Sequence, residues 1–455
     1  MDPPAAAPTE LPFAIAHEKR LDDEELEGKK EGVFVTGVPD FSLDPLNGLG
    51  LGAEGYITFD GERTDPFFAY TPYRSRISVA AFITTKDQQQ IEVGFDAPYV
   101  LDSPWRIRTV AEYAKDPNQL YFGTTSSSLR HLRDLYPARS PFAGRNVGSF
   151  DAYSDDLATA RGGGPGEPVS VADNFYDYFT LQQAIVNASV ERSIFDGLVR
   201  LVGGVEVAHV AITTYDGHDA EANDLLAGQT VTVPNGRTRL REDAAAGKVL
   251  GLGHGFVDLV QVGAVYDTRD FEPDPTRGIF AEVTNELSLK PFSRFSFDKV
   301  FGQIKAYQKI FSYDAQRLVL AGRFGTGATL GDAPFFEYQD EWSTEGSIEG
   351  IGGYHTLRGY KQARFVARMM SFLNVELRHR FARFSLLKQD FGLMVVPFVD
   401  TGGVWNNPGE LALDHLRISE GLGFRVSWNQ STIVSFDYGV SEEDQQFFVQ
   451  LGHPF

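Results

Sequence analysis

The sequence predicts an all-β protein, a 16-stranded antiparallel transmembrane β-barrel. Three features of the 455-residue chain support this fold class. Many short segments alternate apolar and polar residues with a period of two, which is the spacing of side chains along a β-strand. We count about sixteen such segments, and an even number is what a single-chain antiparallel barrel has when both of its ends lie on one side. The longest connections all follow odd-numbered segments, which places them at one end of the barrel.

The alternation is clearest in the last third of the chain. Between Ser371 and Arg380, apolar residues share one face of the expected strand and polar residues share the other. A helix would distribute both kinds around its circumference. An apolar face suits contact with lipid, and a polar face suits a wide lumen. The apolar face consists of Leu373, Val375 and Leu377, and the polar face of Asn374, Glu376, Arg378 and Arg380.

The same pattern gives the remaining strands in chain order. The segments are Val33–Gly37, Gly50–Phe59, Ser75–Thr85, Gln90–Tyr99, Trp105–Tyr113, Tyr176–Val190, Leu198–Thr214, Val257–Asp267, Gly278–Leu289, Phe297–Phe311, Arg317–Thr329, Met370–Phe381, Gly392–Trp405, Gly421–Trp428, Thr432–Gly439 and Gln446–Phe455.

Connection lengths orient the predicted barrel. Long connections at Gly123–Asn174, Tyr215–Gly253 and Leu330–Arg368 follow the fifth, seventh and eleventh segments. Connections after even-numbered segments are mostly short, such as Ser193–Gly197. Outer-membrane barrels have long loops outside and short turns in the periplasm. We therefore expect a barrel in the outer membrane of a Gram-negative-type bacterium, with both termini periplasmic and lipid around it.

The last expected strand ends the chain on an aromatic residue. Val449, Leu451 and Phe455 share one face of this strand. A terminal phenylalanine at the periplasmic interface is typical of outer-membrane barrel strands. A soluble sandwich can also end on a strand, so this feature supports the barrel only together with the others.

Composition excludes several other classes of protein. The chain has 62 acidic and 41 basic residues, a formal net charge of −21, which argues against nucleic acid as a partner because phosphate binding needs a basic surface. It has no cysteine, which excludes disulfide scaffolds, thiolate metal sites and cysteine nucleophiles. The most apolar stretch, Leu198–Thr214, is interrupted by charged residues and is too polar for a membrane-spanning helix.

The chain divides into an N-terminal tail and the barrel. Residues 1–30 are too few for a separate domain. The charged run Glu18–Lys30 is compatible with one short helix. We expect a solvated periplasmic tail, and a helix that binds a partner or plugs the barrel is the alternative. Residues 31–455 are expected to form the barrel.

The most specific motif begins in the third long connection. Gly352–Tyr360 reads GGYHTLRGY, Glu376 follows on the next alternating segment, and Pro397–Trp405 reads PFVDTGGVW on the one after. In these residues the chain resembles the BamA/TamA superfamily of outer-membrane protein insertases and two-partner-secretion transporters, the bacterial surface antigen type. Its sixteen-stranded barrel carries an LRGY-type motif in the sixth extracellular loop, an acidic residue on the next strand and an FxDxG element on the following one.

The resemblance covers the chain from about Lys30 to Phe455. Lys29–Pro39, Asp44–Gly52, Phe68–Arg74 and Tyr121–Gly123 are similar to a subgroup that lacks POTRA domains. Because the tail has only about thirty residues, we expect no such domain in this chain. The resemblance implies a role in inserting or translocating proteins through a lateral seam between the first and last strands.

The motif also has a physical interpretation of its own. Arg358 lies on a connection long enough to fold into the lumen, and Glu376 and Asp400 belong to inward-facing polar positions of neighbouring strands. A guanidinium can meet a carboxylate through two parallel hydrogen bonds and stays charged. We therefore expect a long extracellular loop folded into the lumen, with Arg358 fastening it to the wall.

Neighbouring residues complete this loop contact. Gly359 allows a close approach of the turn, and Tyr360 or Phe398 can cover the ion pair from water. The contact acts either as a fixed strut that fills the lumen or as a moving gate. The strut is favoured because a buried pair is costly to break once formed.

We expect neither a catalytic site nor a metal or cofactor site. The chain contains no GxSxG or HExxH motif, and its nine histidines are scattered. The acidic stretches Asp216–Asp224 and Glu337–Glu341 lack the EF-hand spacing of calcium ligands. A site assembled from distant loops stays open as an alternative.

Three functions are compatible with these observations. In the first, the barrel helps to insert or translocate proteins through the seam, where Gly32, Gly37 and Pro39 interrupt the first strand and Gly452 and Pro454 weaken the last. In the second, it is a structural or docking barrel that holds other outer-membrane or surface proteins through its tail or acidic outer loops. The third is a loop-built enzyme or a small-solute pore.

Overall fold

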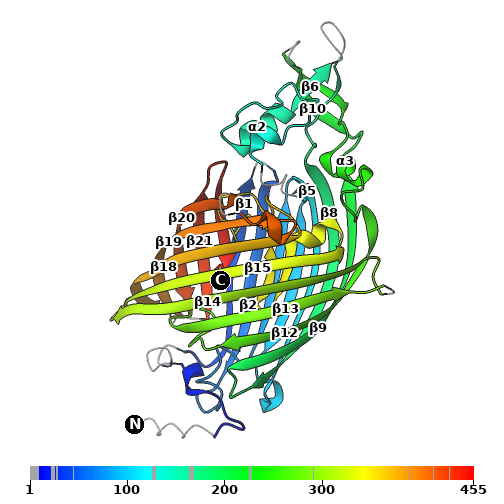
Figure 1. Ribbon diagram of the computed structural model, residues 1–455. Coiled ribbons are helices and arrows are strands. Elements are labelled where there is room, and N and C mark those ends of the chain that lie inside the picture. Colours follow the sequence, from blue (N-terminus) through cyan, green and yellow to red (C-terminus); the bar gives the residue numbers. More distant parts are fainter. Residues whose placement is uncertain are drawn as a thin grey trace.

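One large antiparallel sheet dominates the computed structural model. The structure describes residues 10–21, 26, 29–44, 46–124, 130–162, 169–224, 228–290, 292–387, 389–412, 415–429 and 431–455. The sheet has sixteen strands, and each pairs with the next barrel strand along the chain (Figure 1). The predicted fold class and strand number are therefore confirmed.

The sheet runs in the order β1-β2-β3-β4-β5-β8-β9-β12-β13-β14-β15-β18-β19-β20-β21-β22. Its strands are β1 (Gly32–Asp44), β2 (Gly48–Gly61), β3 (Ser75–Thr84), β4 (Gln89–Ala97), β5 (Trp105–Leu120), β8 (Tyr178–Ile194), β9 (Val199–Thr214), β12 (Gly253–Asp267), β13 (Gly278–Ser288), β14 (Ser296–Tyr313), β15 (Gln316–Asp332), β18 (Met369–Leu386), β19 (Gln389–Trp405), β20 (Arg417–Trp428), β21 (Thr432–Val440) and β22 (Gln445–Leu451).

The first strand is longer than the sequence pattern predicts. We expected Gly37 and Pro39 to interrupt it, but β1 continues through both residues, and Pro39 lies opposite Ala53 of β2. The expected interruption is thus wrong. Proline lacks a backbone N–H and is tolerated at the edge of a sheet, and β1 is the first strand in the sheet order.

The long connections lie at one end of the barrel, here called the loop end, and short turns lie at the other, the turn end. The long connections are residues 121–177, 215–252 and 333–368, after the fifth, seventh and eleventh barrel strands as expected. The first two fold together into a cap with a four-stranded sheet, β11-β10-β6-β7. Figure 1 shows the cap at the top and the N-terminal segment at the opposite end.

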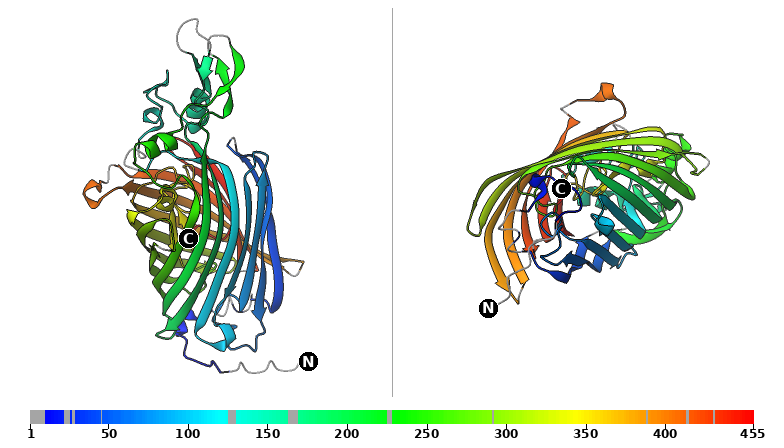
Figure 2. Two further views of the ribbon diagram at one scale, coloured as in Figure 1. Left: turned by 90° about the vertical axis from the view of Figure 1, so that its right-hand side faces the viewer. Right: turned by 90° about the horizontal axis from the view of Figure 1, so that it is seen from below.

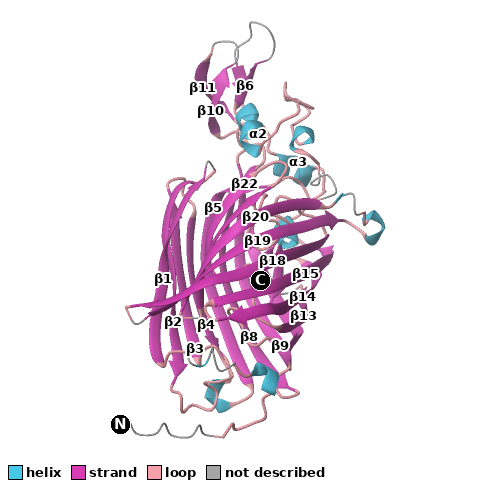
Figure 3. Cartoon of the chain, turned by 90° about the vertical axis from the view of Figure 1, so that its left-hand side faces the viewer, coloured by secondary structure: helices cyan, strands magenta, loops and turns pink. Residues whose placement is uncertain are grey.

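The remaining elements are short. Figure 3 shows helices only in connecting segments. Within the described part of the chain, no helix combines the length and apolar character needed to cross a bilayer. These elements are β6 (Thr159–Gly162), β7 (Val169–Val171), β10 (Asp219–Asp224), β11 (Gln229–Pro234), β16 (Asp340–Ser343), β17 (Gly346–Glu349), α2 (Phe150–Leu157), α3 (Arg239–Ala245), and the 3₁₀ turns η1 (His17–Lys19), η2 (Val100–Asp102), η4 (Leu132–Asp134), η5 (Phe335–Gln339) and η6 (Pro408–Glu410).

Burial follows the predicted alternation. On β18, Leu373 and Val375 are 42% and 40% exposed, while Asn374 and Glu376 between them are 1% and 0% exposed. The sheet therefore presents apolar side chains outward, where lipid would contact them, and buries its polar and charged side chains in the lumen.

The N-terminal tail departs from the expectation of a solvated segment. Residues 10–21 lie against the turn end of the barrel, where Ala16 N–H donates to Asp196 O over 2.7 Å and Leu21 N–H donates to Ala69 O over 2.9 Å. Lys19 and Leu21 are buried. Of the predicted helix, the structure has the single turn η1, and residues 22–25 and 27–28 lie outside the described residues.

Candidate functional site

The third long connection, residues 333–368, enters the lumen, where many of its side chains are buried, and is called the lumen loop. Its hairpin β16–β17 packs against inward-facing side chains of β13 and β14. Thr284 Oγ1 donates to Trp342 O over 2.8 Å, and Lys299 Nζ donates to Asp340 O over 2.8 Å. The loop therefore contacts the barrel wall through hydrogen bonds and does not extend into solvent at the loop end.

Arg358 joins the lumen loop to the wall. Its Nε and Nη2 donate to Asp400 Oδ2 and Oδ1, each over 2.9 Å, in the bidentate arrangement that guanidinium and carboxylate groups favour. Its Nη1 donates to Glu376 Oε1 over 2.6 Å and to Asp437 Oδ2 over 2.8 Å. All four side chains are fully buried. The structure thus brings together the three charged residues of the sequence motif and adds Asp437.

Two further arginines complete this group of charges. Arg425 Nη1 and Nη2 donate to Glu376 Oε2 and Oε1 over 2.9 and 2.7 Å, and Arg378 Nε donates to Glu376 Oε2 over 2.8 Å. We call the set the charge cluster. It contains three guanidinium groups and three carboxylates, so its net formal charge is zero. Balance of this kind is what burial in a low-dielectric environment requires. The cluster comprises Arg358, Glu376, Arg378, Asp400, Arg425 and Asp437.

The sequence motif predicts only part of this cluster. Alternation places Arg378 on the inward face of its strand, but it does not show that Arg378 pairs with Glu376. Arg425 and Asp437 lie on β20 and β21, beyond the segments that carry the motif. The sequence does indicate that Asp437 faces the lumen, because it is an acidic residue between Phe436 and Tyr438 on an alternating strand.

The uncharged motif residues have distinct places. The Arg358 guanidinium carbon lies 3.4 Å from the centre of the Phe398 ring, so Phe398 covers the cation. Tyr360 instead packs edge-on against Phe365, with ring centres 5.1 Å apart. A Cβ on Gly359 would lie 2.5 Å from the carbonyl carbon of Val440, which is closer than atoms can approach. Only glycine fits where the loop meets this wall.

The C-terminal residues do not follow the expectation of a strand that continues to Phe455. β22 ends at Leu451, and Gly452 has φ +97°, a conformation that favours glycine. Phe455 turns into the lumen and is 7% exposed, with its ring 5.0 Å from the Arg323 guanidinium and 5.1 Å from that of Arg378. Figure 2, seen from below, shows the C-terminus inside the ring of strands. The placement of Phe455 at a lipid interface is therefore wrong, because two buried cations hold the ring inside. Val449 does stay on the strand, opposite Phe436.

The two ends of the sheet form a seam. β1 has thirteen residues and β22 has seven, and in the described part of the chain no backbone ladder joins them. Side-chain contacts cross the seam where β22 has ended. The hydroxyl oxygen of Thr36 on β1 is 2.9 Å from that of Thr432 on β21, and Lys30 Nζ lies 2.7 Å from Asp390 Oδ2 on β19. The edge of β1 is thus free to pair with another strand.

Among the described residues, no group of three or more histidine, aspartate or glutamate side chains has the arrangement of a metal site.

Comparisons with known proteins place the chain in a family. Residues 74–455 match the model of the Omp85 superfamily domain, and residues 11–74 match a domain of unknown function, DUF5982. A comparison with curated protein sequences gave no match.

Similar solved structures are distant in sequence. BamA from Haemophilus ducreyi lacking POTRA domains 1–3 is 14% identical, with a TM-score of 0.49, and the match covers 93% of this chain and 69% of that one. CdiB from Acinetobacter baumannii is 9% identical, with a TM-score of 0.45 and coverage of 91% and 58%. CdiB from Escherichia coli is 9% identical, with a TM-score of 0.48 and coverage of 92% and 60%. The family assignment therefore rests on the sequence model, which spans most of the chain. By that match, the protein is an outer-membrane β-barrel that belongs to the Omp85 superfamily.

Proposed function

We propose that this barrel helps to insert or translocate proteins through the seam between β1 and β22, with the turn end and both termini in the periplasm. The unpaired edge of β1 is the observation that carries the proposal. An exposed strand edge presents unused backbone donors and acceptors, which an incoming strand can pair with. Val33 and Val35 on β1 are 59% and 73% exposed, so an arriving apolar strand would also find apolar neighbours.

The lumen loop and the charge cluster also support this proposal, because together they form a fixed frame on the C-terminal side of the seam. Six balanced, buried charges hold the loop to β18, β19, β20 and β21, which form the C-terminal side of the seam. A rigid C-terminal wall leaves β1 and β22 as the elements that move. The position of the lumen loop inside the barrel also disfavours a small-solute pore.

A disulfide across the seam tests the proposal. The Thr36 and Thr432 hydroxyl oxygens are 2.9 Å apart, so the Thr36→Cys/Thr432→Cys variant places two sulfurs near bonding distance. The native chain has no other cysteine. The variant is reconstituted in lipid vesicles, and the assembly of an added eight-stranded outer-membrane barrel is followed by its heat-modifiable mobility on gels.

A matched control separates seam closure from disulfide formation. Thr326 and Ser371 also have hydroxyl oxygens 2.9 Å apart, but they are paired residues of neighbouring strands, β15 and β18. We expect the oxidised seam variant to lose at least about ten-fold in client assembly and to recover on reduction, while the Thr326→Cys/Ser371→Cys variant is unaffected. Normal assembly by the oxidised seam variant would exclude lateral opening.

A docking barrel is the second candidate. The cap at the loop end supports it, because two connections far apart in sequence build one folded unit there, with β6 and β10 paired in parallel. Such a surface suits a partner at the outer membrane. Stable copurification of a second protein, lost on replacing the cap and not on locking the seam, would favour this function.

A further inference from the structure

The N-terminal segment, residues 10–21, occupies a groove at the turn end. Turns between barrel strands form the groove, namely residues 62–74, 98–104, 195–198 and 268–277. Phe13 is half-buried and packs against two aromatic rings of the rim, 5.5 Å from the Phe67 ring and 5.4 Å from the Tyr99 ring, which stack on each other at 5.0 Å. The segment therefore contributes an aromatic side chain to a three-ring cluster at the barrel rim.

A lysine anchors the other end of the segment. Lys19 Nζ lies 2.9 Å from Asp267 Oδ2, and the side chain is buried. Burial lowers the pKa of Lys19 from its usual value, with Asp267 acting in the opposite direction. The segment thus makes two specific contacts, an aromatic one at Phe13 and a cationic one six residues later.

The buried carboxylate of the groove keeps cationic partners when the segment is absent. Asp267 also pairs with Arg200 and Arg269, each at 3.0 Å. Loss of Lys19 would leave Asp267 with two guanidinium partners, so departure of the segment exposes no unpaired carboxylate. The segment itself has a short hydrogen-bonded contact with the rim, in contrast to the continuous ladders of the barrel strands. Segments held this way detach at lower cost than strands do.

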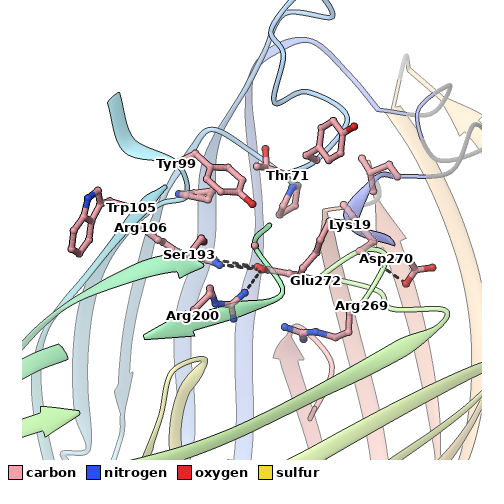
Figure 4. Close-up of a pocket in the computed structure, with 16 residues that line it drawn as sticks. Lys19, Thr71, Tyr99, Trp105, Arg106, Ser193, Arg200, Arg269, Asp270 and Glu272 are labelled. Carbon is pink, nitrogen blue, oxygen red and sulfur yellow. Dashed lines mark hydrogen bonds and ion pairs between the residues drawn. The ribbon is translucent and has the colours of Figure 1, made fainter. Parts of the chain in front are cut away.

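The groove also has features of a prepared binding site. Tyr99 and Leu101 adopt φ angles of +53° and +52°, which are rare for aromatic and aliphatic residues and occur where a fold must hold a particular surface. A small cavity remains beside Lys19 and Leu21, with Trp105, Arg106 and Glu272 in its lining (Figure 4). The segment therefore does not fill the groove completely.

The family comparison groups the N-terminal segment with one of the turns that it contacts. The matched domain of unknown function begins at residue 11, within the segment, and ends at residue 74, the last residue of the turn that contains Phe67. Segment and receptor turn therefore fall within one sequence model.

From these observations we propose that the groove is a peptide-binding site. Its ligand class is an extended peptide with an aromatic residue and, six positions later, a lysine, and the N-terminal segment is its resident ligand. The segment is detachable, and a periplasmic peptide of the same chemistry takes its place. This proposal does not depend on lateral opening of the seam.

Peptide binding to the full chain tests the proposal. A fluorescein-labelled peptide with the sequence of residues 10–21 is titrated with detergent-solubilised wild-type protein and with the Phe13→Ala/Lys19→Ala variant, and fluorescence polarisation is measured. A tethered ligand acts at a millimolar effective concentration and therefore competes strongly with free peptide. We expect saturable binding to the variant, at least about ten-fold tighter than binding to the wild type.

Two altered peptides test whether binding depends on the aromatic residue. The Phe13→Ala peptide should bind at least about ten-fold more weakly, and the Glu18→Gln peptide, which changes an exposed residue, should bind unchanged. The single Phe13→Ala protein variant is measured alongside, in case the double change impairs folding, and heat-modifiable mobility verifies that each barrel is intact. Equal binding to wild type and variants, absent binding to an intact variant, or equal binding of the Phe13→Ala peptide would overturn the proposal.

Discussion

Replacing Glu376 by glutamine should destabilise the barrel strongly. The carboxylate accepts four hydrogen bonds from three arginines, at 2.6 to 2.9 Å. The Glu376→Gln variant keeps the side-chain shape but leaves three guanidinium groups with two carboxylates in the charge cluster. Removing one partner from a buried ion pair typically costs about 3–5 kcal/mol, because the opposite charge stays buried. We expect a loss of this size in the free energy of unfolding.

A second substitution should recover part of this loss. Glu376 is the carboxylate that Arg378 contacts, so the Glu376→Gln/Arg378→Met variant restores equal numbers of positive and negative charges. The double variant should therefore be more stable than the sum of the two single changes predicts, by about 1–3 kcal/mol, as is usual for residues that share a network.

Urea unfolding in lipid vesicles measures these differences. Tryptophan fluorescence follows the transition, and linear extrapolation gives the free energy of unfolding. Glu420→Gln is the matched control, because the same change is made on an exposed side chain of β20 and should have little effect. A Glu376→Gln variant within about 1 kcal/mol of the wild type, or strictly additive substitutions, would refute the assignment of Glu376 to a buried, balanced cluster.

Further predictions concern the loop contact and the C-terminal residues. Gly359→Ala should displace the lumen loop, since the added Cβ would meet the Val440 backbone at 2.5 Å, and limited proteolysis should cleave residues 350–360 faster than in the wild type. Gly148→Ala is its control, because a Cβ there meets nothing within 4 Å, and equal cleavage of the two variants would contradict the close approach. Phe455→Ala should loosen the C-terminal residues, because it removes the ring held between two arginines, and hydrogen exchange at the Gly452 amide, which donates to Ile433 O, should accelerate. Unchanged exchange would show that the ring does not hold this segment.

The fold was predictable because its signal is local. Alternation at Leu373, Asn374, Val375 and Glu376 is visible within a few residues, and the barrel repeats that pattern along the chain. Connection lengths then oriented the strands. Neither property depends on which distant residues meet.

The details of the site depend on contacts that the local pattern does not contain. Asp437 is 79 residues from Arg358, and nothing near either residue shows that they pair. Docking of the N-terminal segment likewise depends on Phe13 meeting Tyr99 across the barrel rim. The inward turn of Phe455 escaped prediction because alternation continues past Leu451, whereas the conformation of Gly452 ends the strand.

The layout of the charge cluster also sets an order of assembly. Every carboxylate that Arg358 contacts lies later in the chain, at Glu376, Asp400 and Asp437. Early hairpins such as β1–β2 form from neighbouring residues, but the charge cluster is complete only when β21 has been made and folded. A chain that ended between Arg425 and Asp437 would hold three guanidinium groups against two carboxylates in its interior. Sealing of the lumen is therefore a late, long-range event, and it acts as a check that the C-terminal strands are in place.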